Sequence, residues 1–334
     1  MADVSEKVPA SVKSLQEVYE VIAVEMAEVN RLLRQELQDS SPFIDGMLKH
    51  GLQLGGKRLR PALVLLSGKL CGKVTQAHLL LATALELVHT ASLVHDDVLD
   101  EAQLRRHMET MNARWDNSAS VLIGDYLLAR ALCLASSLDS VVACREIARA
   151  SHRMCQGELR QIAACGRFHM PEEEYLEIIT EKTAALCQAC CRLGAYYAEA
   201  PPAFIEDLGA FGLLVGVAFQ IIDDILDILG DEEKTGKSLG SDLAKQKPTL
   251  PIIHMLRHLP EPSRERMINL LREQPPGFRQ EVRRVMLETG SIEYAREKAA
   301  MFIGDAVERL ADLPVSPASE SLRQLAAFVI ARDR

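Results

Sequence analysis

The chain has 334 residues, of which 38 are Lys or Arg and 47 are Asp or Glu, so its formal net charge is −9. This acidic balance argues against a nucleic-acid partner, which would need a basic face. Hydrophobic residues make up 48% of the chain and aromatic residues 4%, with 19 glycines and 14 prolines. Such a composition is typical of a globular protein and favours helices over strands.

The sequence carries no obvious targeting signal. It has no run of about 18 apolar residues, and its N-terminal segment lacks the apolar core of a signal peptide. We therefore expect no membrane span and a cytoplasmic location. The eight cysteines do not resemble a secreted disulfide framework. Cys187, Cys190 and Cys191 invite a zinc interpretation, but no second Cys/His pair follows them, so buried thiols are favoured.

Apolar residues recur at helical spacing along most of the chain. After residues 1–14, which we expect to be a poorly ordered tail, an amphipathic helix is predicted up to about residue 40. Further long helices are predicted at 73–101, 118–138, 171–200 and 201–231. Because these are apolar nearly all round, they belong in the core of a large bundle. The segments between them do not read as long linkers, so we predict one all-α domain over residues 1–334.

Two acidic motifs share one spacing. They are "DDVLD", with Asp96, Asp97 and Asp100, and "DDILD", with Asp223, Asp224 and Asp227. Like charges at helical spacing repel by about 0.2–0.5 kcal/mol per pair, while carboxylates at i and i+4 lie within reach of one ion. A single cluster could be a solvated acidic turn. Two clusters, each at the end of an apolar stretch, favour metal binding.

The chemistry of the clusters narrows the choice of metal. Hard oxygen donors without a nearby histidine pair favour Mg²⁺ or Mn²⁺ over zinc. Mg²⁺ usually completes its shell with water and substrate phosphate, so a phosphorylated substrate is implied. Candidate phosphate-binding cations lie near both motifs: Lys57, Arg58, Arg60, Arg105, Arg106, Lys237, Lys245 and Lys247. Taken singly, each is more often a surface residue. "TGKSLGSD" lacks the spacing of a nucleotide-binding P-loop.

The ordered motifs "GGKRLRP", "HDDVLDEAQLRR", "GDYLLAR", "EKTA", "FQIIDDILD" and "GKSLGSDLAKQKPTLP" resemble those of the trans-isoprenyl diphosphate synthases. The similarity extends from about residue 15 to near the C-terminus. It implies an all-helical bundle around a deep central cavity, usually a homodimer. It also implies that Mg²⁺, three ions with substrate bound, holds an allylic diphosphate between the two clusters. Loose membrane association for product release would be compatible with it.

The resemblance assigns roles by motif position. Asp96, Asp100 and Asp223 would be direct metal ligands, whereas Asp97, Asp224 and Asp227 would be ligands or would hold metal-bound water. The allylic diphosphate would be bound by Arg105, Lys182, Lys237 and Lys247. The diphosphate of isopentenyl diphosphate would be bound by Lys57, Arg60, His89 and Arg106.

The implied reaction is the transfer of a prenyl group. Metals and cations would stabilise the departing diphosphate, and the double bond of isopentenyl diphosphate would attack the allylic cation. Thr183, the Lys182 carbonyl and Gln220 resemble the dipoles that face this cation. Without that context, Thr183 could be a plain helix residue and Gln220 a buried amide. For His89 and His95 we favour anion contact or packing over a role as general base.

Small residues precede the first cluster on one helix face. Val88, Ala91 and Ser92 lie on this face, which leads away from the metals. In the family, the residues four and five before the first Asp help to set product length. Small side chains here would let a growing chain pass, which predicts a hexaprenyl or longer product, although they could also serve close helix packing. A shorter farnesyl or geranylgeranyl product and a non-catalytic modulating subunit are the alternatives.

Four positions depart from the family pattern, and one of them is Ile228, which replaces an aromatic residue often found after the second cluster. His107 and Glu109 stand where a glycine and a proline are usual, and Gln246 replaces a common glycine. These departures put the path of both loops in question. A terpene cyclase is disfavoured, because it usually has an Asn/Ser/Glu metal motif in place of the second Asp cluster.

Overall fold

The computed structural model describes residues 14–53, 56–138, 140–229 and 240–332, without the side chains of residues 52 and 53. Of the expected tail, residues 1–13 lie outside the described part. Ser14 is described and caps the first helix, accepting a hydrogen bond from the Glu17 backbone N–H while Glu17 accepts one from Ser14 N–H. This reciprocal capping box fixes the start of the first helix.

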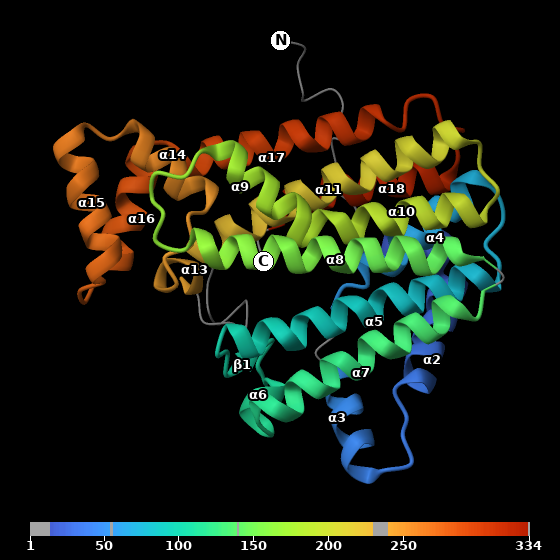
Figure 1. Cartoon of the computed structure of the whole chain (residues 1–334). Helices are drawn as coiled ribbons and strands as arrows, with labels where there is room; N and C mark the ends of the chain where they lie inside the picture. Colours follow the sequence, from blue (N-terminus) through green and yellow to red (C-terminus); the bar gives the residue numbers. More distant parts are fainter. Residues whose placement is uncertain (1–13, 54–55, 139, 230–239, 333–334) are drawn as a thin grey trace.

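The described chain is almost entirely helical (Figure 1). The first half contains α1 (Leu15–Val18), η2 (Glu20–Ile22), α2 (Ala23–Glu36), α3 (Pro42–Gln53), α4 (Leu59–Cys71), α5 (Gln76–Leu99), β1 (Leu104–Arg105), β2 (Met108–Glu109), α6 (Met111–Arg114), α7 (Asn117–Ser136) and α8 (Val141–Ala164). The second half contains α9 (Glu172–Ile179), the π-helical turn η3 (Thr180–Ala184), α10 (Ala185–Tyr197), α11 (Pro202–Leu229), α13 (Ser241–Ala244), α14 (Leu250–His258), α15 (Glu261–Glu273), α16 (Phe278–Glu288), α17 (Ser291–Glu308) and α18 (Pro317–Ile330).

The prediction of an all-α bundle is confirmed. Helix α5 packs against α4, α7 and α10, and α11 packs against α10, α17 and α18. One hydrophobic cluster of buried residues extends from Val18 in α1 to Val329 in α18. The deep central cavity stays a prediction.

Helix α7 differs from the expectation that apolar helices are buried. Both α5 and α7 are long and apolar enough to cross a membrane by length and composition, with mean hydropathies of 1.5 and 1.4. Within these apolar windows, 67% of the α5 residues are buried in the bundle but only 33% of the α7 residues. Leu122 of α7 remains 68% exposed and Val121 42% exposed. The apolarity of α5 is explained by the core, and that of α7 is not.

The two aspartate clusters reach the same end of the bundle. The first lies in the last turn of α5, and Asp100 is the C-cap residue. The second lies in the last two turns of α11, which contacts α13. In Figure 1 the hairpin β1–β2 after α5 and the short helix α13 after α11 lie at this end. The fold therefore brings together segments more than a hundred residues apart.

A tight hairpin carries the two arginines that follow the first cluster. Strands β1 and β2 pair antiparallel, with Arg105 opposite Met108. The two turn residues Arg106 and His107 have φ values of 52° and 64°. A two-residue turn with positive φ at both positions matches the twist of a hairpin, and glycine adopts it most easily. This positive φ explains why glycine is usual at position 107. In this chain His107 adopts the same left-handed conformation.

Candidate active site

The three carboxylates of the first cluster have different surroundings. Asp97 is fully buried, and Arg105 donates to both of its oxygens, with Nε 2.9 Å from Oδ1 and 3.1 Å from Oδ2. Asp96 is only partly buried. Burial raises the pKa of Asp96, while Lys182 lowers it and Glu158 and Asp100 raise it further. Asp97 therefore anchors Arg105, whereas Asp96 and Asp100 border the site.

The second cluster divides in a similar way. The buried Asp224 accepts hydrogen bonds of 2.7 Å from the Tyr175 hydroxyl and from the Gln220 amide. Burial, reinforced by the Asp242 carboxylate, raises the pKa of Asp224 to about 8. The half-buried Asp223 instead forms an ion pair with Arg332, whose Nη1 lies 2.9 Å from Oδ1. Asp223 is thus paired with a single arginine, whereas Asp224 belongs to a buried hydrogen-bond network.

Asp227 anchors the turn that carries two lysines. Its carboxylate accepts from the backbone N–H and hydroxyl of Ser241, at 3.3 and 3.1 Å, and from the Asp242 N–H at 3.1 Å. Burial and the Asp242 charge raise the pKa of Asp227 to about 6. The end of α11 and the start of α13 are held together by these contacts.

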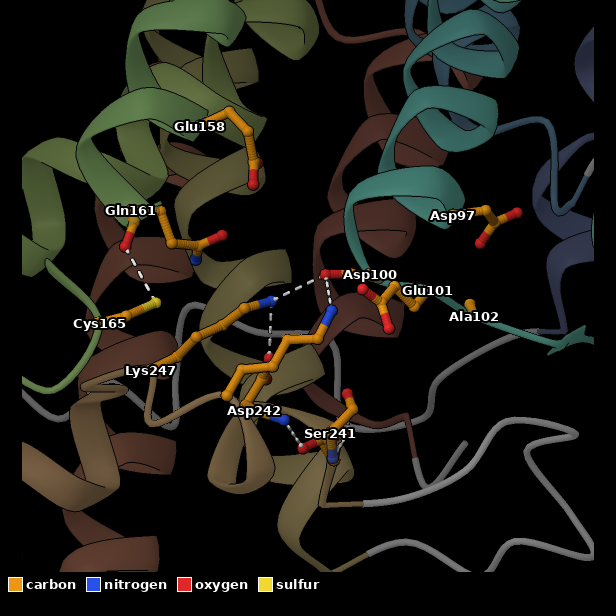
Figure 2. Close-up of polar contacts among 12 residues, drawn as sticks. Asp97, Asp100, Glu101, Ala102, Glu158, Gln161, Cys165, Ser241, Asp242 and Lys247 are labelled. Carbon is orange, nitrogen blue, oxygen red and sulfur yellow. Dashed lines mark hydrogen bonds and ion pairs between the residues drawn. The ribbon is translucent and has the colours of Figure 1, made fainter. Parts of the chain in front are cut away.

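The lysine turn connects the two clusters (Figure 2). Lys245 Nζ contacts Asp100 Oδ1 directly, and Lys247 Nζ lies 3.8 Å from the same oxygen and 3.1 Å from Asp242. Burial alone would raise the pKa of Asp100, but Lys247 and Lys245 lower it below its usual value. Figure 2 shows Asp97 pointing away from this pair, and Glu158 and Gln161 of α8 facing it from the other side. The carboxyl ends of α5 and α11 are therefore joined through Asp100, the lysines, Asp242 and Asp227.

Lys182 and Thr183 lie in the π-helical turn η3. A wider turn of this kind is rare and often occurs at functional sites. Lys182 Nζ donates to Gln161 at 2.6 Å and pairs with Glu158. Thr183 donates to the Gln220 side-chain oxygen at 2.7 Å, so it joins the network that ends at Asp224.

Two glycines allow neighbouring helices to approach this turn. A Cβ on Gly157 of α8 would lie 2.3 Å from the Lys182 backbone nitrogen, and one on Gly216 of α11 would lie 2.6 Å from the Ala184 Cα. Any side chain at either position would force the helices apart. These close contacts fix where Lys182 and Thr183 lie relative to α8 and α11.

A second basic region forms around the segment "GGKRLRP". The Arg106 guanidinium lies against Gly56, where a Cβ would come within 2.3 Å of its Nη2. Tyr19 donates a hydrogen bond of 2.9 Å to the Lys57 carbonyl, and Lys57 Nζ lies 5.1 Å from the Phe328 ring centre. The buried Arg60 keeps an Nε without a partner among the described residues. The hairpin and this segment thus present Lys57, Arg60 and Arg106 together.

His89 lies among these arginines. Burial lowers the pKa of His89 well below its usual value, and the charges of Arg60, Arg105 and Arg106 lower it further. The ring is therefore neutral at pH 7, which suits a hydrogen bond and not an ionic contact. The side chains predicted to bind the second diphosphate are all in one region. Of those predicted for the allylic diphosphate, Lys237 lies outside the described residues, and Arg105 is held by Asp97.

The predicted chain-length residues lie on α5, in the two turns that precede the first cluster. Val88 and Ala91 are each 3% exposed, and Ser92 donates to the His89 carbonyl at 2.8 Å. Their burial agrees with both a tunnel wall and a close helix contact.

The donor set fits a hard divalent cation. The groups are carboxylates, and burial and mutual repulsion raise the pKa values of Asp96, Asp224 and Asp227, so added positive charge would be favourable there. Within the described ranges, no three His, Cys, Asp or Glu side chains converge enough to hold an ion alone. This arrangement is compatible with Mg²⁺, which takes few protein ligands and completes its shell with water and phosphate.

Sequence reasoning missed three partners of the site. Gln161 follows Glu158 by three residues and so lies on the same helix face, a signal that could have identified it. Tyr175 and Arg332 have no such local signal, because they reach Asp224 and Asp223 only through the packing of distant helices.

The bundle is that of an isoprenoid synthase, with acidic and basic groups gathered at one end. The family model for polyprenyl synthetase matches residues 41–288. Octaprenyl diphosphate synthase of Escherichia coli (strain K12) is 35% identical over 323 residues, 96% of this chain and 100% of that protein. Heptaprenyl diphosphate synthase component 2 of Geobacillus stearothermophilus is 37% identical over 96% of this chain and 99% of that protein.

Comparison with solved structures gives the same family. The polyprenyl synthase of Caulobacter crescentus CB15, complexed with calcium and isoprenyl diphosphate, superposes with a TM-score of 0.92 and 35% identity, over 98% of this chain and 100% of that one. A decaprenyl diphosphate synthase from Rhodobacter capsulatus gives 0.90 at 35% identity, over 96% and 100%. The chain belongs to the polyprenyl synthetase family and is a trans-prenyltransferase.

Proposed function

We propose that this enzyme elongates an allylic diphosphate with isopentenyl diphosphate units to an all-trans polyprenyl diphosphate of hexaprenyl length or longer. The observation that supports this most directly is the joining of the two aspartate clusters through the lysine turn at one end of the bundle. A second basic region, with Arg106 against Gly56, supports a separate site for a second diphosphate.

The proposed metal is Mg²⁺, three ions with substrate bound, with Mn²⁺ as a substitute. Asp96, Asp100 and Asp223 would be its ligands. Asp97, Asp224 and Asp227, which make the internal hydrogen bonds described above, would orient them and hold metal-bound water. When bound, the metal would neutralise the negative charge that develops on the departing diphosphate.

The protein's own residues would supply binding and orientation. Lys182, Lys247 and Lys237 would bind the allylic diphosphate, and Arg105 would reach it from its anchor on Asp97. Lys57, Arg60, His89 and Arg106 would bind isopentenyl diphosphate next to it, in reactive geometry. The dipoles of Thr183, Gln220 and the Lys182 carbonyl would face the allylic cation.

The buried face of α5 would form the tunnel wall. Val88, Ala91 and Ser92 are small or medium in size, so a growing chain could extend past them. Each buried methylene contributes about 0.8 kcal/mol, which favours continued elongation in an open tunnel.

We further propose that residues 1–334 form one domain and that the enzyme is a homodimer in the cytoplasm. The continuous core supports the single domain. The dimer is supported by apolar side chains left exposed on α7 and α8: Val121, Leu122, Leu132, Leu159 and Ile162. All eight cysteines are free thiols, as suits a reducing compartment.

The test is a product assay. Purified enzyme with Mg²⁺, farnesyl diphosphate and excess labelled isopentenyl diphosphate should release diphosphate and yield prenyl chains of at least six units on reversed-phase chromatography. A product that stops at geranylgeranyl would refute the open tunnel. If no allylic primer led to diphosphate release, the chain would be a modulating subunit.

A further inference from the structure

Lys245 is one of the candidate phosphate-binding cations, but the family resemblance gives it no particular role. Its Nζ contacts Asp100 Oδ1, the carboxylate oxygen that Lys247 also approaches (Figure 2). The side chains of Lys245 and Asp100 are 29% and 37% exposed, so the pair is open to incoming solutes. Asp100 is also a proposed metal ligand. A metal ion on Asp100 would therefore compete directly with Lys245.

Lys245 and Lys247 differ in the carboxylate partners that remain to them once a metal ion binds Asp100. Lys247 Nζ lies 3.1 Å from Asp242 and 3.8 Å from Asp100, so it retains a carboxylate partner. Among the described residues, Asp100 is the carboxylate that Lys245 pairs with. Displacement from Asp100 would leave the Lys245 ammonium without a paired carboxylate among the described residues, close to where negative phosphate oxygens would arrive.

The backbone under Lys245 is held in place, so its side chain is the part that can move. Lys245 N–H donates to the Ser241 carbonyl at 3.0 Å, and Lys247 N–H donates to the Asp242 carbonyl at 2.9 Å. Between them, Gln246 adopts a φ of 54°, and its carbonyl accepts from Gly166 N–H at 2.9 Å. The Gln246 amide also donates to the Arg272 carbonyl at 3.3 Å. These tethers explain how a glutamine occupies a position that favours glycine.

We propose that Lys245 is an exchangeable counter-ion. Its ammonium neutralises Asp100 before the metal binds, and it then swings to form an ion pair with the diphosphate of the allylic substrate. This role rests on the proposed function. Removing the ammonium should strengthen metal binding, because a competitor of the metal is lost. It should weaken binding of the allylic substrate, because a ligand of the diphosphate is lost.

The experiment compares Lys245→Met with wild type. Titration of the substrate-free protein with Mn²⁺, followed by electron paramagnetic resonance, should show a Kd several-fold lower in the variant. Steady-state kinetics should show a KM for farnesyl diphosphate about tenfold higher, as expected for one lost hydrogen bond to a charged group. The KM for isopentenyl diphosphate should stay unchanged. Lys245→Arg should restore the KM for farnesyl diphosphate.

Two controls keep the result interpretable. Lys49→Met removes an exposed lysine that pairs with Asp45 on α3, and it should leave both quantities at wild-type values. Thermal unfolding identifies a misfolded variant, in which case Lys245→Gln is measured in its place. A Mn²⁺ Kd that is unchanged or higher would overturn the proposal, and so would an unchanged KM for farnesyl diphosphate. Wild-type protein without prenyl transfer would instead refute the proposed function, and the Mn²⁺ titration would still report on Lys245.

Discussion

The segment that carries Lys57 and Arg60 depends on a buried ion pair that can be removed by one substitution. Arg58 is the N-cap residue of α4, has a φ of 53° in the left-handed region, and makes no side-chain capping hydrogen bond. Its Nη1 instead lies 2.6 Å from Glu86 Oε1, and the two side chains are 17% and 2% exposed. Glu86 therefore holds the strained residue between two proposed ligands of isopentenyl diphosphate.

The expected cost of Glu86→Gln follows from this burial. Removing one partner of a buried pair costs about 3–5 kcal/mol, because the other charge is left uncompensated. Since Arg58 is partly exposed and the amide can still accept a hydrogen bond, we expect the lower end, about 3 kcal/mol of unfolding free energy. The loosened loop should raise the KM for isopentenyl diphosphate and leave that for the allylic primer unchanged.

Urea denaturation in the presence of a chelator measures the stability change, and steady-state kinetics measure the two KM values. The matched control is Glu28→Gln, which breaks the exposed pair with Arg31 on α2 and should leave the urea midpoint unchanged. If Glu86→Gln behaved like Glu28→Gln in both assays, the ion pair would not position the loop.

Four further outcomes are expected. Burial and Asp242 raise the pKa of Asp224 to about 8. The folded state therefore keeps a proton between about pH 4 and 8 that the unfolded chain has released. Metal-free wild type should lose stability as pH rises through this window, by up to about 1.4 kcal/mol per pH unit relative to Asp224→Asn; parallel stability curves from denaturation at pH 5, 6.5 and 8 would contradict this. His107→Gly should raise the unfolding free energy by about 1 kcal/mol, because it relieves a left-handed residue, and a lower urea midpoint would argue against strain in the turn. Ser92→Phe should shorten the product seen by chromatography, whereas wild-type length would exclude this face of α5 as the tunnel wall. Leu122→Glu should shift the protein towards monomer in analytical ultracentrifugation, and an unchanged dimer would place the interface elsewhere.

Local spacing predicted the fold class and the two aspartate clusters, whereas the roles of the other proposed site residues came from the family resemblance. The i, i+1, i+4 repeat identified both clusters, and long apolar stretches identified α5 and α11 to within a few residues. Spacing could not show that Asp97 and Asp224, the second aspartates of the two clusters, form hydrogen bonds within the protein. Asp97 meets Arg105, and Asp224 meets Tyr175, through packing that spacing alone does not encode.

Three further features of the structure depend on tertiary contacts and could not be predicted from local sequence. The helix predicted at 171–200 is interrupted by the π-helical turn at 180–184, which forms where Gly157 and Gly216 let α8 and α11 close in. The apolar pattern of α7 predicted a core helix. Apolar residues also occur on exposed surfaces that bind another chain, and the sequence pattern does not distinguish the two cases. Arg332 lies more than a hundred residues from Asp223, and no local pattern connects them.

The proposed chemistry requires both aspartate clusters to hold one metal-bound diphosphate. The most direct test is a crystal structure with Mn²⁺ and the non-cleavable analogue farnesyl thiolodiphosphate, in which anomalous scattering locates the metal. We predict manganese peaks contacting Asp96 and Asp100 on one side and Asp223 on the other, with the diphosphate between them. Manganese at one cluster only, or a diphosphate bound away from both, would contradict the account.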